Sequence, residues 1–215
     1  RRARASSFRH SRPSADQYQS LNSGALSGDF YISRMSNAAL RTLQDALKRG
    51  TFDAAYYICG EDDFQKESAM KQLVGSSIDA SVREFNLDIW RAQEVDPKSF
   101  DAAVSSMPMM AERRVVVIRD VGSLKKDARK AVEGYLAKPV PNVVLLLVEA
   151  SGAKTDKEFS QSATLLDFDL LSADRVPRWI AHQASTELKV LISAAAIELL
   201  QEAVGNDLHQ LVAEL

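Results

Sequence analysis

The strongest constraint on the fold is a run of six consecutive apolar residues, Val143–Val148. A strand that is apolar on both faces has to be covered on both sides, which is typical of a central strand in a parallel sheet. The β-branched run Val115–Ile118 has the same character. Both runs are much too short for a membrane-spanning helix, which needs about 20 apolar residues. They predict an α/β protein whose parallel sheet is flanked by helices, with no membrane contact.

Shorter apolar segments alternate with helical patterns along the middle of the chain, as expected for successive βαβ units. Three further strands are expected at residues 54–59, 85–89 and 164–170. Four helices are expected from their caps and stops: one that ends at Gly50, one from Asp62 or Asp63 to Gly75, one opened by Asp96 and Pro97, and one capped by Ser123.

Beyond Leu171 the strand patterns stop and only helical patterns remain. Helices are expected to begin at Ser172 or Asp174, at Ser193, and after Asp207, and the last one still runs at Leu215. The chain is thus predicted to contain an α/β domain, residues 35–171, and a small, truncated all-helical domain, residues 172–215.

The first 34 residues have six arginines, two aspartates and few large aliphatic side chains. Such a segment cannot bury enough apolar surface to fold alone. We interpret it as a disordered or non-native extension with Met35 as the natural start, and an organelle transit peptide is the alternative. The rest of the chain has 21 basic and 27 acidic residues, a net charge of −6. That balance argues against coating nucleic acid by bulk charge, so any DNA contact has to be local.

The chain offers few residues for catalysis or metal binding. Cys59 is the only cysteine, which excludes a disulfide framework and fits a reducing cytoplasm. Its position within an expected strand favours a buried structural thiol over a nucleophile. The three histidines lack metal-ligand spacing, and neither G-x-S-x-G nor H-E-x-x-H occurs. We predict no cofactor, no metal site and no catalytic residue, and a cytoplasmic protein.

The turn after the first strand is where a phosphate loop, G-x-x-x-x-G-K-[ST], would lie. Residues 60–67 read Gly-Glu-Asp-Asp-Phe-Gln-Lys-Glu, so the second glycine is missing and Glu67 replaces the hydroxyl residue. Like charges about 4 Å apart repel by ~4 kcal/mol at an effective dielectric constant near 20, which Lys66 alone does not offset. We predict that this degenerate turn does not bind ATP; it comprises Gly60, Glu61, Asp62 and Asp63.

A magnesium site would need a pair of acidic residues at the end of a buried strand. The two apolar strands instead end near single carboxylates, Asp120 and Glu149. We interpret these carboxylates as structural or solvated.

Four segments in this order resemble the delta-subunit family of the bacterial DNA polymerase III clamp loader: residues 57–64, 107–119, 176–180 and 204–208. The resemblance extends from about Tyr56 to the end of the chain. It implies an AAA+-like domain with a degenerate P-loop, then a helical lid, and a collar domain that is absent here. It also implies a subunit that binds the beta sliding clamp and opens it for loading onto primed DNA, beside other clamp-loader subunits that hydrolyse ATP.

The resemblance also assigns roles to residues. The family's clamp-binding hydrophobic pair, often leucine and phenylalanine, corresponds to Met109 and Met110, with Met107 and Pro108 beside them. The alternative is that the three methionines cover the core below the next strand. His209 lies where relatives often have arginine, which weakens any role in nucleotide sensing.

A basic run offers possible contacts to DNA phosphates in the assembled loader. The alternative is a solvated helix face. The run comprises Lys125, Lys126, Arg129 and Lys130.

Two other functions compete with the clamp-loader hypothesis. One is a degenerate P-loop enzyme, such as a kinase, that uses an unrecognised nucleotide site. The other is an AAA+-like adaptor for a different partner.

Overall fold

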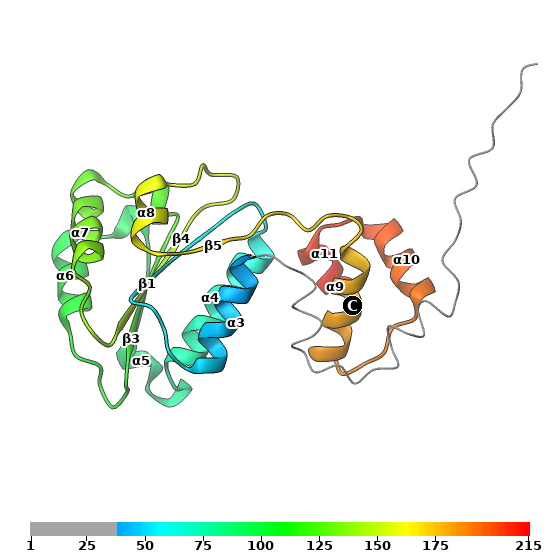
Figure 1. Ribbon diagram of the computed structural model, residues 1–215, viewed down its shortest axis with the longest axis horizontal. Helices are drawn as coiled ribbons and strands as arrows, with labels where there is room; N and C mark the ends of the chain where they lie inside the picture. The colour runs from blue at the N-terminus through cyan, green and yellow to red at the C-terminus, as the bar shows by residue number, and fades with distance from the viewer. Residues whose placement is uncertain (1–37) are drawn as a thin grey trace, which may run out of the picture.

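The structure is a computed structural model that describes residues 38–215 (Figure 1). Its centre is a five-stranded sheet with the order β2-β3-β4-β1-β5, in which every neighbouring pair is parallel. The strands are β1 (Ala55–Cys59), β2 (Leu87–Arg91), β3 (Arg114–Arg119), β4 (Val143–Val148) and β5 (Thr164–Asp167). The predicted extension, residues 1–34, lies outside the described residues.

The all-apolar strand β4 lies in the middle of the sheet, as predicted. It pairs with β3 on one side and β1 on the other, and all six of its residues are buried. Leu145 faces one hydrophobic cluster and Leu146 the other, because successive side chains of a strand point to opposite faces. Strand β2 is an edge strand, and its Ile89 is half exposed.

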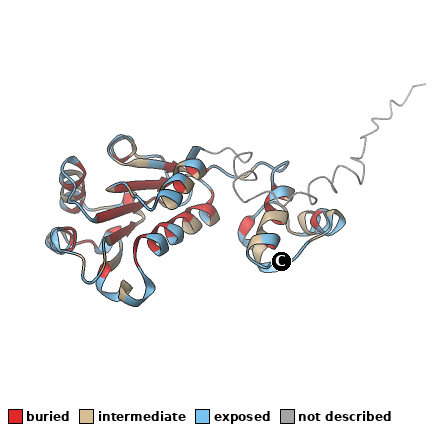
Figure 2. Ribbon diagram, turned by 60° about the horizontal axis from the view of Figure 1, so that its bottom comes forward, coloured by how far each residue is buried: buried red, intermediate tan, exposed pale blue. Residues whose placement is uncertain are grey.

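Helices cover both faces of the sheet (Figures 1 and 2). On one face, α3 (Ala38–Arg49) and α4 (Asp63–Ser77) contribute Leu43 and Leu73 to the core. On the other face lie α6 (Pro97–Ser105), α7 (Lys126–Ala137) and α8 (Lys157–Ser162). The short elements are η1 (Ala80–Val82), α5 (Arg83–Asn86), η2 (Ala92–Glu94) and η3 (Val121–Ser123).

A third hydrophobic cluster is formed by the last three helices, α9 (Val176–Thr186), α10 (Ala194–Val204) and α11 (Leu208–Glu214). Ile180 and Leu211 are fully buried in its centre. Phe64, at the start of α4, reaches this cluster, with its ring centroid 5.4 Å from that of Trp179. Among the described helices, none is long and apolar enough to cross a membrane.

Several predicted helix ends are confirmed because a short polar side chain binds the free amides of the first turn. Asp62 accepts from the Gln65 amide at the start of α4, and Asp96 does the same for α6, whose first residue is Pro97. Ser193 and Asp207 cap α10 and α11. Gly50 follows α3 with φ +63°, a conformation that favours glycine.

Three helix boundaries were predicted wrongly. Ser123 belongs to η3, and α7 begins at Lys126 without a side-chain cap, because the left-handed turn at Asp120 places a 3₁₀ turn first. Helix α4 continues past Gly75 to Ser77, and the Ile78 amide still bonds to the helix through the Val74 carbonyl. Helix α9 begins only at Val176, not at Ser172 or Asp174.

Two strand predictions were too long. Phe85 lies in α5, and β2 starts at Leu87. The apparent alternation of Phe85 with Leu87 and Ile89 was misleading, because Phe85 and Ile89 are both about half exposed. Strand β5 ends at Asp167, three residues before Leu170.

Candidate functional site

The turn between β1 and α4 is closed by the chain's own backbone. Gly60 has φ +107°, and a Cβ atom there would lie 2.2 Å from the Phe168 carbonyl oxygen. The Asp62 amide donates to that same carbonyl over 3.0 Å. A phosphate loop needs free amides and open space at this position. The segment after β5 occupies the space, and one of the amides is already bonded.

The carboxylates of the turn have different environments. Asp62 is buried and accepts from the amide and the side chain of Gln65, over 3.0 and 2.8 Å. Glu61 and Asp63 are exposed. Partial burial acts to raise the pKa of Asp63, but the hydrogen bond from the Lys66 ammonium lowers the pKa overall. The turn therefore presents negative charge where a phosphate would arrive.

Lys66, at the position of a phosphate-loop lysine, points into the protein. Its ammonium lies 2.9 Å from Asp63 Oδ1 and donates to the Glu149 carbonyl over 3.2 Å, and the residue is only 2% exposed. Glu67, at the hydroxyl position, pairs with Arg119 over 2.6 Å. Both residues that would contact a nucleotide or its magnesium are paired within the chain.

Glu149, at the end of β4, is buried in a satisfied hydrogen-bond network. Its Oε2 accepts from the Tyr57 hydroxyl over 3.1 Å. Its Oε1 accepts from the amides of Gly122 and Ala150, each over 3.1 Å. The Tyr57 hydroxyl in turn accepts from the Asp156 amide, and burial raises the pKa of this tyrosine. The structural interpretation of this strand-end carboxylate is confirmed.

A cavity of about 430 Å³ lies between this turn and the last helices. Among the described residues, no lysine or arginine lines it. His209 is exposed at its edge and stacks edge-on against Phe64, with centroids 5.3 Å apart. Its acidic lining, which disfavours a triphosphate, comprises Glu61, Asp62, Asp63 and Asp207.

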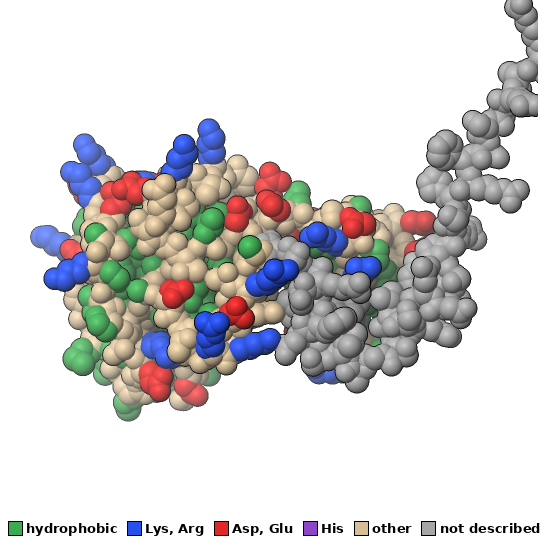
Figure 3. Space-filling view, viewed as in Figure 1, with side chains coloured by type: hydrophobic (Ala, Val, Ile, Leu, Met, Phe, Trp, Pro, Cys, Tyr) green, Lys and Arg blue, Asp and Glu red, His purple; other side chains and the backbone are tan. Residues whose placement is uncertain are grey.

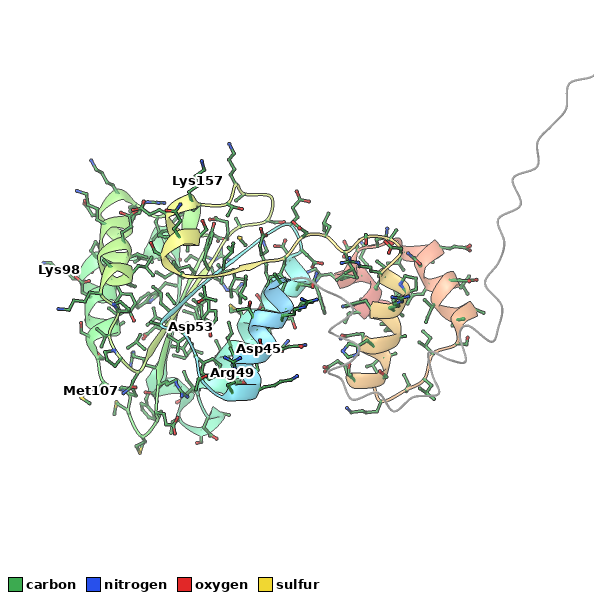
Figure 4. The ribbon with its side chains drawn as sticks, in the orientation of Figure 1. Asp45, Arg49, Asp53, Lys98, Met107 and Lys157 are labelled. Atoms are coloured by element: carbon green, nitrogen blue, oxygen red, sulfur yellow. The ribbon has the colours of Figure 1, made fainter. Side chains whose placement is uncertain are left out.

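The predicted clamp-binding tip, Met107–Met110, connects α6 to β3. Because the sheet is parallel, this tip lies at the amino edge of the strands, opposite the Gly60 turn. Met107, Met109 and Met110 are 83%, 53% and 79% exposed, and Pro108 is half-buried. The alternative that the methionines cover the core is therefore wrong. Figure 4 labels Met107 at the end of the molecule that is far from α9–α11. Figure 3 shows hydrophobic side chains at the surface of this same end.

Asn86 fixes the backbone of this tip, and sequence reasoning missed it. The residue is fully buried at the end of α5. Its Nδ2 donates to the Met109 carbonyl over 2.8 Å, and its Oδ1 accepts from the Met109 amide over 2.7 Å. The two residues are 23 positions apart, so no local sequence pattern connects them.

Arg114, the first residue of β3, connects the strand that follows the tip to α5 and β2. Its guanidinium donates to the Phe85 carbonyl over 2.8 Å and to Asp88 over 2.5 Å. Met110 has φ +53°, which is uncommon for a residue with a Cβ atom.

The predicted DNA contacts lie at the start of α7 and within it, and they fall into two groups. Lys125, Lys126 and Lys130 are exposed. Arg129 is half-buried and bonds within the chain, above all to Asp156 over 2.7 Å, and its guanidinium lies 4.6 Å from the centre of the Phe159 ring. Of these four candidates, the three lysines are the ones without an ion pair to another residue within 38–215.

The remaining candidates are structural. Cys59 is fully buried, and this burial raises the pKa of its thiol to about 12. Within residues 38–215, no group of three or more histidine, cysteine, aspartate or glutamate side chains is placed to hold a metal ion.

Comparison with known proteins places this geometry in a family. The family model described as DNA polymerase III, delta subunit matches residues 56–170. The DNA polymerase III subunit delta of Bacillus subtilis is 23% identical over 174 residues, which cover 75% of this chain and 50% of the relative. The chain therefore spans about half the length of this relative.

Solved structures show the same fold. The Bacillus subtilis DNA clamp loader delta protein matches with a TM-score of 0.62 at 22% identity, over 81% of this chain and 55% of that one. The Thermotoga maritima RuvB Holliday junction branch migration motor matches with a TM-score of 0.58 at 14% identity, over 86% and 60% of the two chains. The predicted AAA+-like fold, a parallel sheet flanked by helices and followed by further helices, is confirmed. With a family model that matches more than half of its residues, this chain belongs to the DNA polymerase III delta-subunit family.

Proposed function

We propose that this chain is a non-catalytic clamp-loader subunit that binds the beta sliding clamp and opens it for loading onto primed DNA. The observation that carries the proposal is the exposed methionine tip, Met107–Met110, whose backbone is anchored while its side chains face solvent. Methionine side chains adapt to apolar pockets on a partner. Full burial of each contributes roughly 1.5–3 kcal/mol.

The closed turn at Gly60 supports the non-catalytic part of the proposal. A triphosphate would have to displace the Phe168 carbonyl and break the pairing of Lys66, and it would meet the four acidic side chains that line the cavity. In our proposal the other clamp-loader subunits bind and hydrolyse ATP. Residues 35–171 act as the clamp-binding domain, and residues 172–215 act as the helical lid.

The exposed lysines at the start and on the surface of α7 are proposed as contacts to the phosphates of primed DNA in the assembled complex: Lys125 just before the helix, and Lys126 and Lys130 within it. Arg129 is left out of this proposal because its charge is paired internally.

The test is a binding assay between the purified chain and its cognate sliding clamp, with and without ATP and magnesium. We expect binding that does not depend on ATP, and a loss of at least about tenfold in affinity for Met109→Ala/Met110→Ala. Leu191→Ala is the control, because Leu191 is 84% exposed but lies in the connection between α9 and α10. Undiminished binding by the double variant would exclude the tip as the clamp contact.

The same samples test the competing enzyme hypothesis. Tight, magnesium-dependent ATP binding by the isolated chain would favour a degenerate P-loop enzyme over our proposal. Retention of neither ATP nor the clamp would favour an adaptor with another partner.

A further inference from the structure

We propose that Asn86 is a positioning residue that holds the methionine tip, Met107–Met110, in one conformation before its partner arrives. This inference rests on the proposed function, in which the tip binds the sliding clamp. Asn86 itself is fully buried, so it reaches the partner only through the residues that it holds.

Both N–H groups of the Asn86 side chain donate hydrogen bonds, and its oxygen accepts one. One Nδ2 hydrogen bonds to the Val82 carbonyl over 2.9 Å, within the turn that leads into α5. The other bonds to the Met109 carbonyl over 2.8 Å, and Oδ1 accepts from the Met109 amide over 2.7 Å. The bond to Val82 fixes the orientation of the amide, so that its remaining donor and its acceptor both face Met109. This two-way pairing imitates the pairing of neighbouring strands.

The conformation of the tip follows from this pairing. Both polar groups of the Met109 backbone bond to Asn86, and the Met109 side chain is 53% exposed. Met110 then takes a left-handed conformation, φ +53°, which persists in non-glycine residues only where the surroundings impose it. Arg114, where β3 begins, bonds to the Phe85 carbonyl beside Asn86, so the strand that follows the tip is also joined to α5.

The surface that results is apolar and preformed. Phe85, next to Asn86 in α5, is 48% exposed, and Met110 is 79% exposed. A preordered loop loses less conformational entropy when it binds than a mobile loop does. The expected partner surface is an apolar pocket that accepts these side chains. Loss of the Asn86 pairing should weaken binding although no contact to the partner is removed, because the loop then has to be ordered when it binds.

The experiment compares the full chain with Asn86→Ala and with Gln65→Ala, a control. Gln65 is also buried and hydrogen-bonded, but it lies in α4 at the opposite edge of the sheet. Amide hydrogen exchange in the free protein is measured by NMR, together with affinity for the cognate sliding clamp. The Met109 amide donates to Asn86, whereas no acceptor within residues 38–215 bonds to the Met110 amide. In the unsubstituted protein we therefore expect the Met109 amide to exchange about 100-fold more slowly than the Met110 amide.

In Asn86→Ala we expect this protection of Met109 to be lost and clamp affinity to fall about tenfold, while Gln65→Ala retains both. Equal exchange at Met109 and Met110 in the unsubstituted protein would overturn the inference, and this readout needs no variant that folds. Lost protection in Asn86→Ala with full clamp affinity would also overturn it. Failure of the proposed function is recognised separately, because the unsubstituted protein itself would then not bind the clamp.

Discussion

Lys66 donates a hydrogen bond from its ammonium nitrogen to the main-chain carbonyl oxygen of Glu149, over 3.2 Å. The bond joins the first turn of α4 to the end of the central strand β4. In a phosphate loop, a lysine at this position contacts the nucleotide phosphates. Here it connects two elements of the core, while the Glu149 carboxylate accepts three further hydrogen bonds. At the edge of the sheet where a nucleotide would bind, Lys66 and Glu149 thus hold α4 and β4 together by hydrogen bonds.

Replacement of Lys66 by methionine should destabilise the protein without affecting any nucleotide response. Lys66→Met keeps most of the apolar stem but removes the ammonium, so the buried Glu149 carbonyl loses its donor and Asp63 loses its ion-pair partner. The unpaired carbonyl alone costs about 1–3 kcal/mol. Urea denaturation at neutral pH measures the loss. Lys71→Met, on the same helix with an exposed side chain, should change stability by less than about 0.5 kcal/mol. A rise in melting temperature with magnesium and ATP that Lys66→Met abolishes would contradict this view of the turn.

Two glycine substitutions should have opposite effects. Gly60→Ala places a Cβ atom 2.2 Å from the Phe168 carbonyl oxygen at φ +107°, so we expect a loss of roughly 3 kcal/mol or more. Gly134→Ala, in the middle of α7 with open space around it, should gain about 0.5–1 kcal/mol. Thermal or urea denaturation of both variants distinguishes a steric requirement from a general preference for glycine. A stable Gly60→Ala protein would show that the segment after β5 does not close the turn.

The thiol of Cys59 should be unreactive in the folded protein. Burial raises its pKa to about 12, so at pH 8 almost none of the reactive thiolate is present, and the residue is fully buried as well. A thiol reagent such as iodoacetamide should label it only after denaturation. Rapid labelling under native conditions would mean that β1 opens locally, since this strand lies next to the central strand β4.

Much of the fold was predictable because its signals are local. The all-apolar pattern of Val143–Val148 identified the central strand, and short polar caps such as Asp62 and Asp96 marked helix starts. Errors arose where backbone geometry overrides local preference. Gly75 is the predicted end of α4, but the helix continues to Ser77. Ser123 is the predicted cap of α7, but the left-handed turn at Asp120 places it in the preceding 3₁₀ turn.

The candidate site was only partly predictable, for a different reason. The composition of the degenerate turn and of the methionine tip can be read directly from the sequence. The partner of each group cannot, because these partners are distant along the chain. Asn86 binds Met109 from 23 positions away, and Arg129 binds Asp156 from 27 positions away. The sequence groups Arg129 with the neighbouring lysines because its ion-pair partner, Asp156, is distant in the sequence and caps a different helix, α8.

The pairing of Arg129 with Asp156 should make stability depend on pH in the acid range. The hydrogen bond from Arg129 lowers the pKa of Asp156, despite the opposing effect of partial burial. A carboxyl whose pKa is lower in the folded state stabilises the fold above its unfolded pKa, about 3.9, and this contribution is lost as pH falls through the folded value. Arg129→Met removes the share of this contribution that Arg129 provides, together with its bonds to Glu133 and Glu158, so it should cost about 1–3 kcal/mol near pH 7.

The difference between Arg129→Met and the unsubstituted protein should therefore shrink as the pH falls below about 4. Urea denaturation at intervals from pH 3 to 7 measures it. Part of the stability difference should remain at the lowest pH, because the guanidinium also lies over the Phe159 ring. That contact does not depend on the charge of a carboxylate. Lys130→Met is the control, since Lys130 is exposed on the same helix and should show little difference at any pH. A penalty for Arg129→Met that stays constant down to pH 3 would mean that packing on Phe159, and not the ion pair, is what Arg129 contributes.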